Sequence, residues 1–254
     1  MSVTQPSVGR ELSIAADGAA NGAADGATTD VPPMAARWVA EAERLYRRYQ
    51  LEIVEGVGLC PWAARARTDD VFRARVLLGA DAPVEATLEA IDALAKDPGA
   101  EVAVLIYPRL ALGRAAFERF VARVRDADVP RYPIGRVPFV FAAFHPDAEP
   151  DASGAERLIP FLRRTPDPTI QLLRSDVLDR VRSGTPQGTQ FVDQVTFDFN
   201  APLQGHVPLP LRERIARANL ATVDGMGITE MTRRLDAIAQ DRERTYRELE
   251  SAKD

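Results

Sequence analysis

The chain has 254 residues, of which 46% are hydrophobic and 27% are charged, and its net charge is −5. This composition is typical of a globular protein of one or two domains, and it excludes collagen, a coiled coil along the whole length and a wholly disordered chain. The acidic excess argues against nucleic-acid binding through a basic surface, and no apolar run approaches the ~20 residues that cross a bilayer, so neither nucleic acid nor a membrane is expected as a partner.

The first part of the chain is rich in Ala, Gly and Asp and shows no apolar period. Such a segment cannot bury enough surface to offset the entropy of ordering, so we expect a disordered tail over residues 1–33. Order is expected to begin near Met34. An apolar stripe at spacings of three and four then predicts a helix, which Gly56 and Gly58 end. The stripe consists of Trp38, Ala42, Leu45, Tyr46, Tyr49, Ile53 and Val57.

Strand patterns occupy four segments, at 71–78, 102–107, 139–144 and 170–173. The first alternates apolar and charged side chains, which predicts a solvent-facing side near a sheet edge, whereas the second and third are apolar throughout. Helical patterns alternate with them: apolar stripes at 84–95 and 117–124, a capping box at 153–156 and a capped start at Ser175. This order predicts an α/β domain over residues 34–207, with a layered sheet of about four strands and covering helices.

The last part of the chain shows two further helical patterns. Leu211, Ile215 and Ala218 indicate a short helix, and a narrow apolar stripe follows over 229–252. We therefore expect a helical C-terminal extension over residues 208–254. It either packs on the α/β domain or binds a partner or a second copy, and the sequence leaves the oligomeric state open.

Cys60 is the only cysteine of the chain, so no internal disulfide can form, and a cytoplasmic location is expected. It directly precedes Pro61, a favoured first residue of a helix, so Cys60 is expected to cap a short helix. The helix dipole, with Arg65 and Arg67 nearby, would lower the pKa of the thiol. A reactive thiol is one interpretation, and an inert packed cysteine is the other.

His145 directly follows the apolar strand pattern at 139–144. Polar side chains at the carboxyl ends of strands often line ligand crevices in α/β folds. The imidazole could deprotonate a thiol or a substrate. Alternatively, a turn carbonyl before Pro146 could satisfy it.

Arg174 lies where the last strand pattern passes into a helix. A guanidinium beside helix N–H groups can bind a carboxylate or a phosphate. A structural ion pair with Asp147 or Asp176 is the alternative. Gln171 lies on the same strand and is expected to face away from the side that carries Ile170 and Leu172.

Four short motifs stand out: GVGLCPWA at 56–63, FHP at 144–146, RTP at 164–166 and QLLR at 171–174. Together they resemble the bacterial family called domain of unknown function 1415, over about residues 34–200. The resemblance implies a soluble bacterial protein in which these segments are important, and it implies no reaction. Gly58 stands where this family usually has Asn, and Gln171 where it usually has His. If that histidine carries protons, this chain is an altered or inactive member.

No metal or cofactor is expected. His145 and His206 are the only histidines, and no paired spacing such as Cys-x-x-Cys is present. The sequence also contains no P-loop, no dinucleotide glycine fingerprint and no Gly-x-Ser-x-Gly elbow.

Two functions follow from these residues. The first is an enzyme that acts on a small anionic substrate, with Cys60 as nucleophile or redox thiol, His145 as base and Arg174 as anion anchor. The second is a noncatalytic domain that binds a small anion or a protein partner. The residues expected to contact a ligand are Arg174, Gln171, Arg164 and Trp62. The enzyme requires Cys60, His145 and Arg174 to share one concave pocket.

Overall fold

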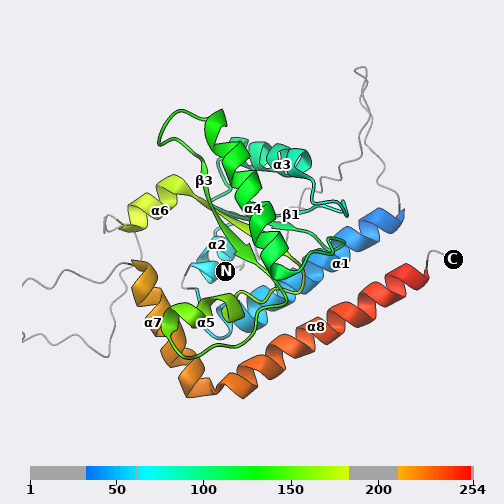
Figure 1. Cartoon of the computed structure of the whole chain (residues 1–254), viewed down its shortest axis with the longest axis vertical. Coiled ribbons are helices and arrows are strands. Elements are labelled where there is room, and N and C mark those ends of the chain that lie inside the picture. The colour runs from blue at the N-terminus through cyan, green and yellow to red at the C-terminus, as the bar shows by residue number, and fades with distance from the viewer. Residues whose placement is uncertain (1–32, 61, 183–210, 253–254) are drawn as a thin grey trace, which may run out of the picture.

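A computed structural model describes residues 33–60, 62–182 and 211–252, and Figure 1 shows their arrangement. The tail expected at 1–33 lies outside the described residues, apart from Pro33. The end of the α/β domain expected at residue 207 also lies outside them. None of the helices described is long and apolar enough to cross a membrane.

The described strands are β1 (Phe72–Val76), β2 (Val102–Ile106), β3 (Phe139–Phe144) and β4 (Thr169–Arg174). They form one sheet in the order β1-β2-β4-β3. Strands β1 and β2 are parallel, and β4 is antiparallel to both of its neighbours. The predicted four-stranded α/β sheet is confirmed. Strand β1 lies at an edge, as its alternating apolar and charged side chains predicted.

The helices before β3 are α1 (Pro33–Tyr49), α2 (Ala63–Thr68), α3 (Val84–Lys96) and α4 (Arg114–Asp128). Two short helical segments accompany them, the π-helix η1 (Gln50–Glu55) and the 3₁₀-helix η2 (Val129–Arg131). The later helices are α5 (Ala155–Leu162), α6 (Ser175–Arg182), α7 (Leu211–Met226) and α8 (Ile228–Ser251). The helical extension expected at the C-terminus is thus confirmed as α7 and α8.

The sheet has two covered sides, because successive side chains of a strand point to opposite faces. On the α1 side, Val76, Val104 and Ile106 pack with residues of α1, η1, α5, α7 and α8. On the α4 side, Leu105 and Leu172 pack with residues of α3 and α4. Each fully buried side chain of this kind contributes about 1.5–3 kcal/mol, so the two cores fix which face of each strand meets which helices.

Helix α8 runs antiparallel to α1 along much of its length (Figure 1). The rings of Trp38 and Tyr246 lie 4.6 Å apart between the two helices. Asp241 of α8 also accepts hydrogen bonds from Arg44 at 2.9 Å and from Arg48 at 2.8 Å. The described part of the extension therefore packs on the α/β domain.

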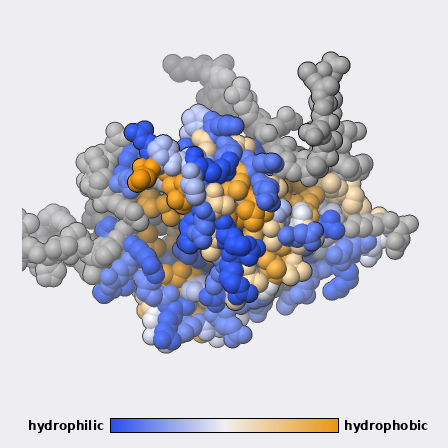
Figure 2. Space-filling view, turned by 45° about the horizontal axis from the view of Figure 1, so that its top comes forward, coloured by the Kyte–Doolittle hydropathy of each residue, from blue (hydrophilic) through white to orange (hydrophobic). Residues whose placement is uncertain are grey.

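Strand β3 lies at the second edge of the sheet, although its six residues are all apolar. Val140 is 46% exposed, and it belongs with Leu51, Val129 and Ile134 to the exposed large apolar side chains of the described residues. Figure 2 shows apolar residues at the surface of the viewed face, interrupted by hydrophilic ones. Phe139 and Phe144 lie at the two ends of β3, on opposite faces of the sheet, and both are buried. The strand is therefore apolar because both of its faces carry buried side chains, although it has only one neighbouring strand.

Candidate functional site

The sheet separates the predicted site residues. Gln171 pairs with Val104 and Ala142, so its side chain lies on the α1 side, facing away from Ile170 and Leu172 as predicted. Cys60 directly follows Leu59, which is buried in the core on the same side. His145 lies beside Phe117 of the other core, with their ring centroids 5.6 Å apart. The predicted thiol and the predicted base therefore belong to opposite sides of the sheet.

Cys60 lies between η1 and α2. The expectation that it caps a helix is wrong, since α2 begins at Ala63 and Trp62 is its N-cap residue. Burial raises the pKa of the Cys60 thiol; the backbone N–H groups of Trp62 and Ala63 lower it by less, and Glu55 raises it further. The net direction is upward, opposite to the sequence-based prediction.

The basic residues near Cys60 are neutralised by carboxylates. Arg65 forms an ion pair with Asp69 at 2.9 Å, and Arg67 forms one with Glu55, also at 2.9 Å. Both guanidiniums are therefore engaged by carboxylates, and burial of the thiol is the main reason why the sequence-based prediction fails. Trp62 follows Cys60 closely in the chain and is half-buried at the start of α2.

Gly58 takes a left-handed conformation, with φ at 74°. Asn is one of the few residues other than glycine that adopt this conformation readily. An Asn at this position, which the resemblance implies for the family, would thus fit the same turn. At Gly56 the restriction is steric, because a Cβ atom would lie 2.8 Å from the carbonyl oxygen of Glu52.

The α1 side of the sheet is only partly covered over β3 and β4. Gln171 is half-buried although it lies on an interior strand, and Ala142 and Leu173 are half-buried too. We call this surface the open shelf; it consists of Val140, Ala142, Gln171 and Leu173. By contrast, Val104 next to Gln171 is wholly buried.

Arg163, at the C-terminal end of α5, lies at one end of the open shelf. Its guanidinium carbon lies 5.2 Å from the ring centroid of Phe144, which shares the α1 side with Gln171. Burial is the main reason why the pKa of Arg163 is lowered; the positive charge of Arg212 adds to it, whereas Tyr49 and Glu156 act in the opposite direction. In the described parts of the chain, no carboxylate pairs with this guanidinium and no hydrogen bond engages it.

Arg163 was not predicted from the sequence, which pointed to its neighbour Arg164. The signal in the sequence was the Arg-Arg pair at the end of a predicted helix. Two successive residues there point in different directions. Arg164 turns towards α8 and pairs with Asp236 at 2.7 Å, whereas Arg163 stacks on Phe144.

Both ring nitrogens of His145 are engaged. Nε2 donates to the carbonyl oxygen of Leu112 at 2.8 Å, and Nδ1 accepts the backbone N–H of Asp147 at 3.1 Å. These two partners fix the tautomer with the proton on Nε2. This geometry favours the interpretation in which His145 is a structural residue over the one in which it is a base. Among the predicted residues, it shares a pocket with Arg164.

Arg174 closes the end of α3 and does not lie beside His145. Its guanidinium donates to the carbonyl oxygens of Asp97 at 2.7 Å, Ala100 at 2.8 Å and Leu94 at 3.2 Å. In the sheet Arg174 pairs with Phe139, at the opposite end of β3 from the residue that precedes His145. Because Cys60, His145 and Arg174 lie in three different places, the geometry gives no support to the enzyme that needs all three.

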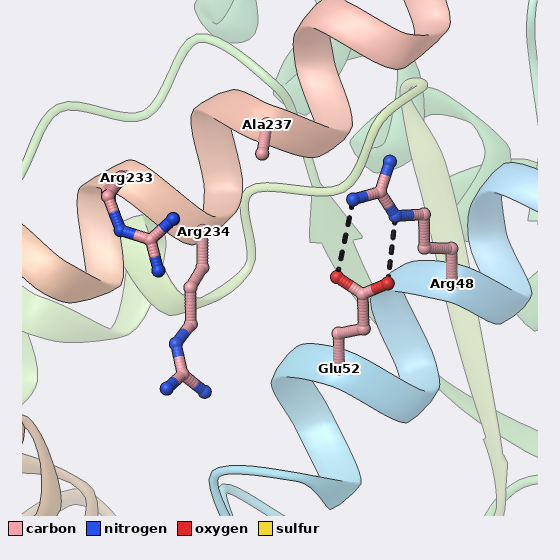
Figure 3. Close-up of a pocket in the computed structure, with 5 residues that line it drawn as sticks. All are labelled: Arg48, Glu52, Arg233, Arg234 and Ala237. Atoms are coloured by element: carbon pink, nitrogen blue, oxygen red, sulfur yellow. Dashed lines mark hydrogen bonds and ion pairs between the residues drawn. The ribbon is translucent and has the colours of Figure 1, made fainter.

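A further hollow, of about 300 Å³, lies between α8 and the continuous helix formed by α1 and η1. Figure 3 shows Arg48 and Glu52 joined across one side of it, with Arg234 extending from α8. Arg233 and Arg234 both pair with Glu230, so each guanidinium in this hollow has a carboxylate partner. No group of three or more potential metal ligands occurs in the part of the chain that the structure describes.

Comparison with known proteins places these residues in context. A family model described as protein of unknown function (DUF1415) matches residues 41–196, more than half of the chain. No curated protein and no solved structure matches the chain. The matched span contains every predicted site residue and Arg163, and it excludes α7 and α8.

Proposed function

The chain belongs to the DUF1415 family of proteins of unknown function, and on that premise we propose that it binds a small anion at the open shelf, beside Arg163. The observation that carries this proposal is a guanidinium that is partly removed from water and forms no ion pair with a carboxylate among the described residues, although Glu156 is near enough to act on its charge. Removing a charge from water is unfavourable unless a counter-charge accompanies it. A bound anion would supply that counter-charge, and a planar guanidinium can bind a carboxylate or a phosphate through two parallel hydrogen bonds.

Gln171 supports the same proposal. It pairs with Ala142, two residues from the pair that Phe144 forms with Thr169, so Gln171 and the Phe144 ring are diagonal neighbours on one face. Its amide can donate and accept hydrogen bonds but does not titrate near neutral pH. Glutamine in place of the usual histidine is therefore compatible with binding and is not compatible with proton transfer.

A thiol-dependent enzyme is the second candidate. The observation in its favour is that the N–H groups of Trp62 and Ala63 are directed at the sulfur of Cys60. Two observations oppose it: burial raises the pKa of this thiol, and the nitrogens of His145 are engaged elsewhere. We propose that Cys60 is a packed thiol. A bacterial cytoplasmic location is part of this proposal, because a lone cysteine forms no internal disulfide.

Thermal unfolding with inorganic phosphate, compared with chloride at the same ionic strength, tests the anion site. We expect phosphate to raise the melting temperature of the wild type and not that of Arg163→Gln. Arg157→Gln is the matched control, since Arg157 lies on the same helix with its side chain 71% exposed. Arg163→Met adds a second test: without phosphate it should be about as stable as the wild type or more stable, because it removes a half-buried charge that forms no ion pair among the described residues. Equal responses to phosphate in the wild type and both Arg163 variants would overturn the proposal.

A further inference from the structure

A second pocket lies beyond the carboxyl ends of β2 and β3, against α8, and has a volume of about 280 Å³. In open α/β sheets, ligands bind in the crevice outside the carboxyl ends of the strands. This pocket is distinct from the open shelf: it contains Arg164 and His145, and its wall includes residues of α8, which the family model does not cover.

Two guanidinium groups line the pocket in fixed positions. Arg164 donates through Nε to the carbonyl oxygen of Pro146 at 2.9 Å and through Nη2 to Asp236 at 2.7 Å. Arg242 donates through Nε to Asp167 at 2.6 Å and through Nη2 to the carbonyl oxygen of Pro108 at 3.3 Å. Within the described residues, these bonds leave Nη1 of each guanidinium without an acceptor. Both groups are therefore held in place with N–H donors still available for a carboxylate.

Two carboxylates line the same pocket. Asp147 follows β3 and has a side chain that is 65% exposed, and Glu243 is an exposed residue of α8. In the described part of the chain, Glu243 forms no ion pair or hydrogen bond. These acidic groups would repel a simple anion and attract an ammonium group.

Apolar side chains also line the pocket, although most of the surface that it offers to a ligand is polar. Leu110, Leu235 and Ile238 line it and are themselves almost wholly buried. Ligand pockets typically combine apolar walls with a few fixed polar groups and span ~300–1,000 Å³. A pocket of about 280 Å³ lies just below that range, which suits a molecule of amino-acid size.

From these features we propose that the pocket binds a small zwitterion of the α-amino-acid class. The ligand carboxylate binds Arg164 and Arg242, and its ammonium group binds Asp147 and Glu243. A plain anion or a plain amine satisfies only half of these groups.

Calorimetric titration of the full chain with L-leucine tests this proposal, with N-acetyl-L-leucine lacking the ammonium group and L-leucinamide lacking the carboxylate. Each analogue loses a charge-assisted contact, so we expect each to bind at least about tenfold more weakly than leucine. Leucine that does not bind, or analogues that bind as tightly as leucine, would overturn the proposal.

Variants locate the ligand. Glu243→Gln should weaken leucine binding severalfold, whereas Glu248→Gln, an exposed change on the same helix, should leave it unchanged. Arg164→Gln should weaken binding too, but Arg164 also anchors α8 through Asp236, so Glu243→Gln is the deciding variant because Glu243 has no such role. Leucine binding unaffected by Glu243→Gln would contradict the assignment. Arg163→Gln should bind leucine normally, so failure of the anion-site proposal and failure of this one are separable.

Discussion

The carboxylate of Asp167 is wholly buried, and its Oδ1 accepts a hydrogen bond from Nε of Arg242 at 2.6 Å. Asp167 precedes β4, whereas Arg242 lies on α8, outside the span that the family model matches. The hydroxyl of Tyr246 donates to the same carboxylate at 2.7 Å. Two residues of the C-terminal helix thus satisfy one buried acid of the family domain.

Arg242→Leu should destabilise the protein strongly. Removing one partner of a buried ion pair leaves the other charge uncompensated, at a cost of about 3–5 kcal/mol. The free energy of unfolding, measured in urea, should fall by that amount. Arg247→Gln is the control on the same helix, because Arg247 is exposed and forms no ion pair among the described residues. A loss for Arg242→Leu no larger than that of the control would show that Asp167 does not depend on α8.

Asp241 should make the packing of α1 against α8 sensitive to acid. Burial raises the pKa of Asp241, but hydrogen bonds from Arg44, Arg48 and Arg244 outweigh it, so the net direction is downward. A carboxylate with a lowered folded-state pKa contributes stability above its unfolded pKa of ~3.9 and loses it as the pH falls through the folded value.

The measurement for Asp241 is the urea midpoint between pH 5 and pH 3, a window of about two units around the ordinary Asp pKa. The wild type should lose more stability over this range than Asp241→Asn, which cannot lose a proton there. Parallel losses in the two proteins would mean that Asp241 is titrated alike in the folded and unfolded states.

Cys60 should react slowly with iodoacetamide. Because burial raises the pKa of its thiol, the rate plotted against pH should give an apparent pKa above the ~8.5 of a free thiol. The urea-unfolded chain supplies the reference, since its thiol is exposed. An apparent pKa below that reference in the folded protein would restore the thiol-enzyme hypothesis.

Gln171→His should be tolerated, since a polar side chain replaces another at a half-buried position, with a stability change of about 1 kcal/mol or less. An imidazolium at the open shelf would add positive charge below its pKa of ~6.5, so phosphate binding should strengthen between about pH 7 and 6. Thermal unfolding with phosphate across this range, for the variant and the wild type, measures the effect. The same pH profile in both would separate position 171 from the anion site.

Much of the fold could be predicted from the sequence, because helices and strands follow local apolar periods. The stripe through Tyr49 and Ile53, the four strands and the side on which Gln171 lies are local properties, and all were correct. The position of β4 between β2 and β3 could not be predicted, because the residue pattern of a strand does not determine which strands lie next to it in the sheet. The edge position of the apolar strand β3 could not be predicted for the same reason.

The candidate site was predicted less well, because proximity in space depends on the strand order. His145 and Arg174 both border strands, but they lie at opposite ends because β3 and β4 are antiparallel. The pKa of Cys60 was predicted wrongly for another reason. Arg65 and Arg67 are close to Cys60 in sequence, but each forms an ion pair with a carboxylate, and the sequence alone does not show these pairs. Arg163 could not be singled out from the sequence, because only the packed structure shows that its guanidinium is half-buried and forms no ion pair among the described residues.

The most direct test of the anion site is a ¹H–¹⁵N spectrum of the arginine Nε–H groups, recorded while phosphate is added at constant ionic strength. The signal that disappears in Arg163→Gln identifies Arg163, and Arg157 supplies an exposed reference on the same helix. We predict a saturable shift of the Arg163 signal, with the Arg157 signal unmoved. An Arg163 signal that stays in place, or that moves in step with Arg157 and never saturates, would contradict the proposed function.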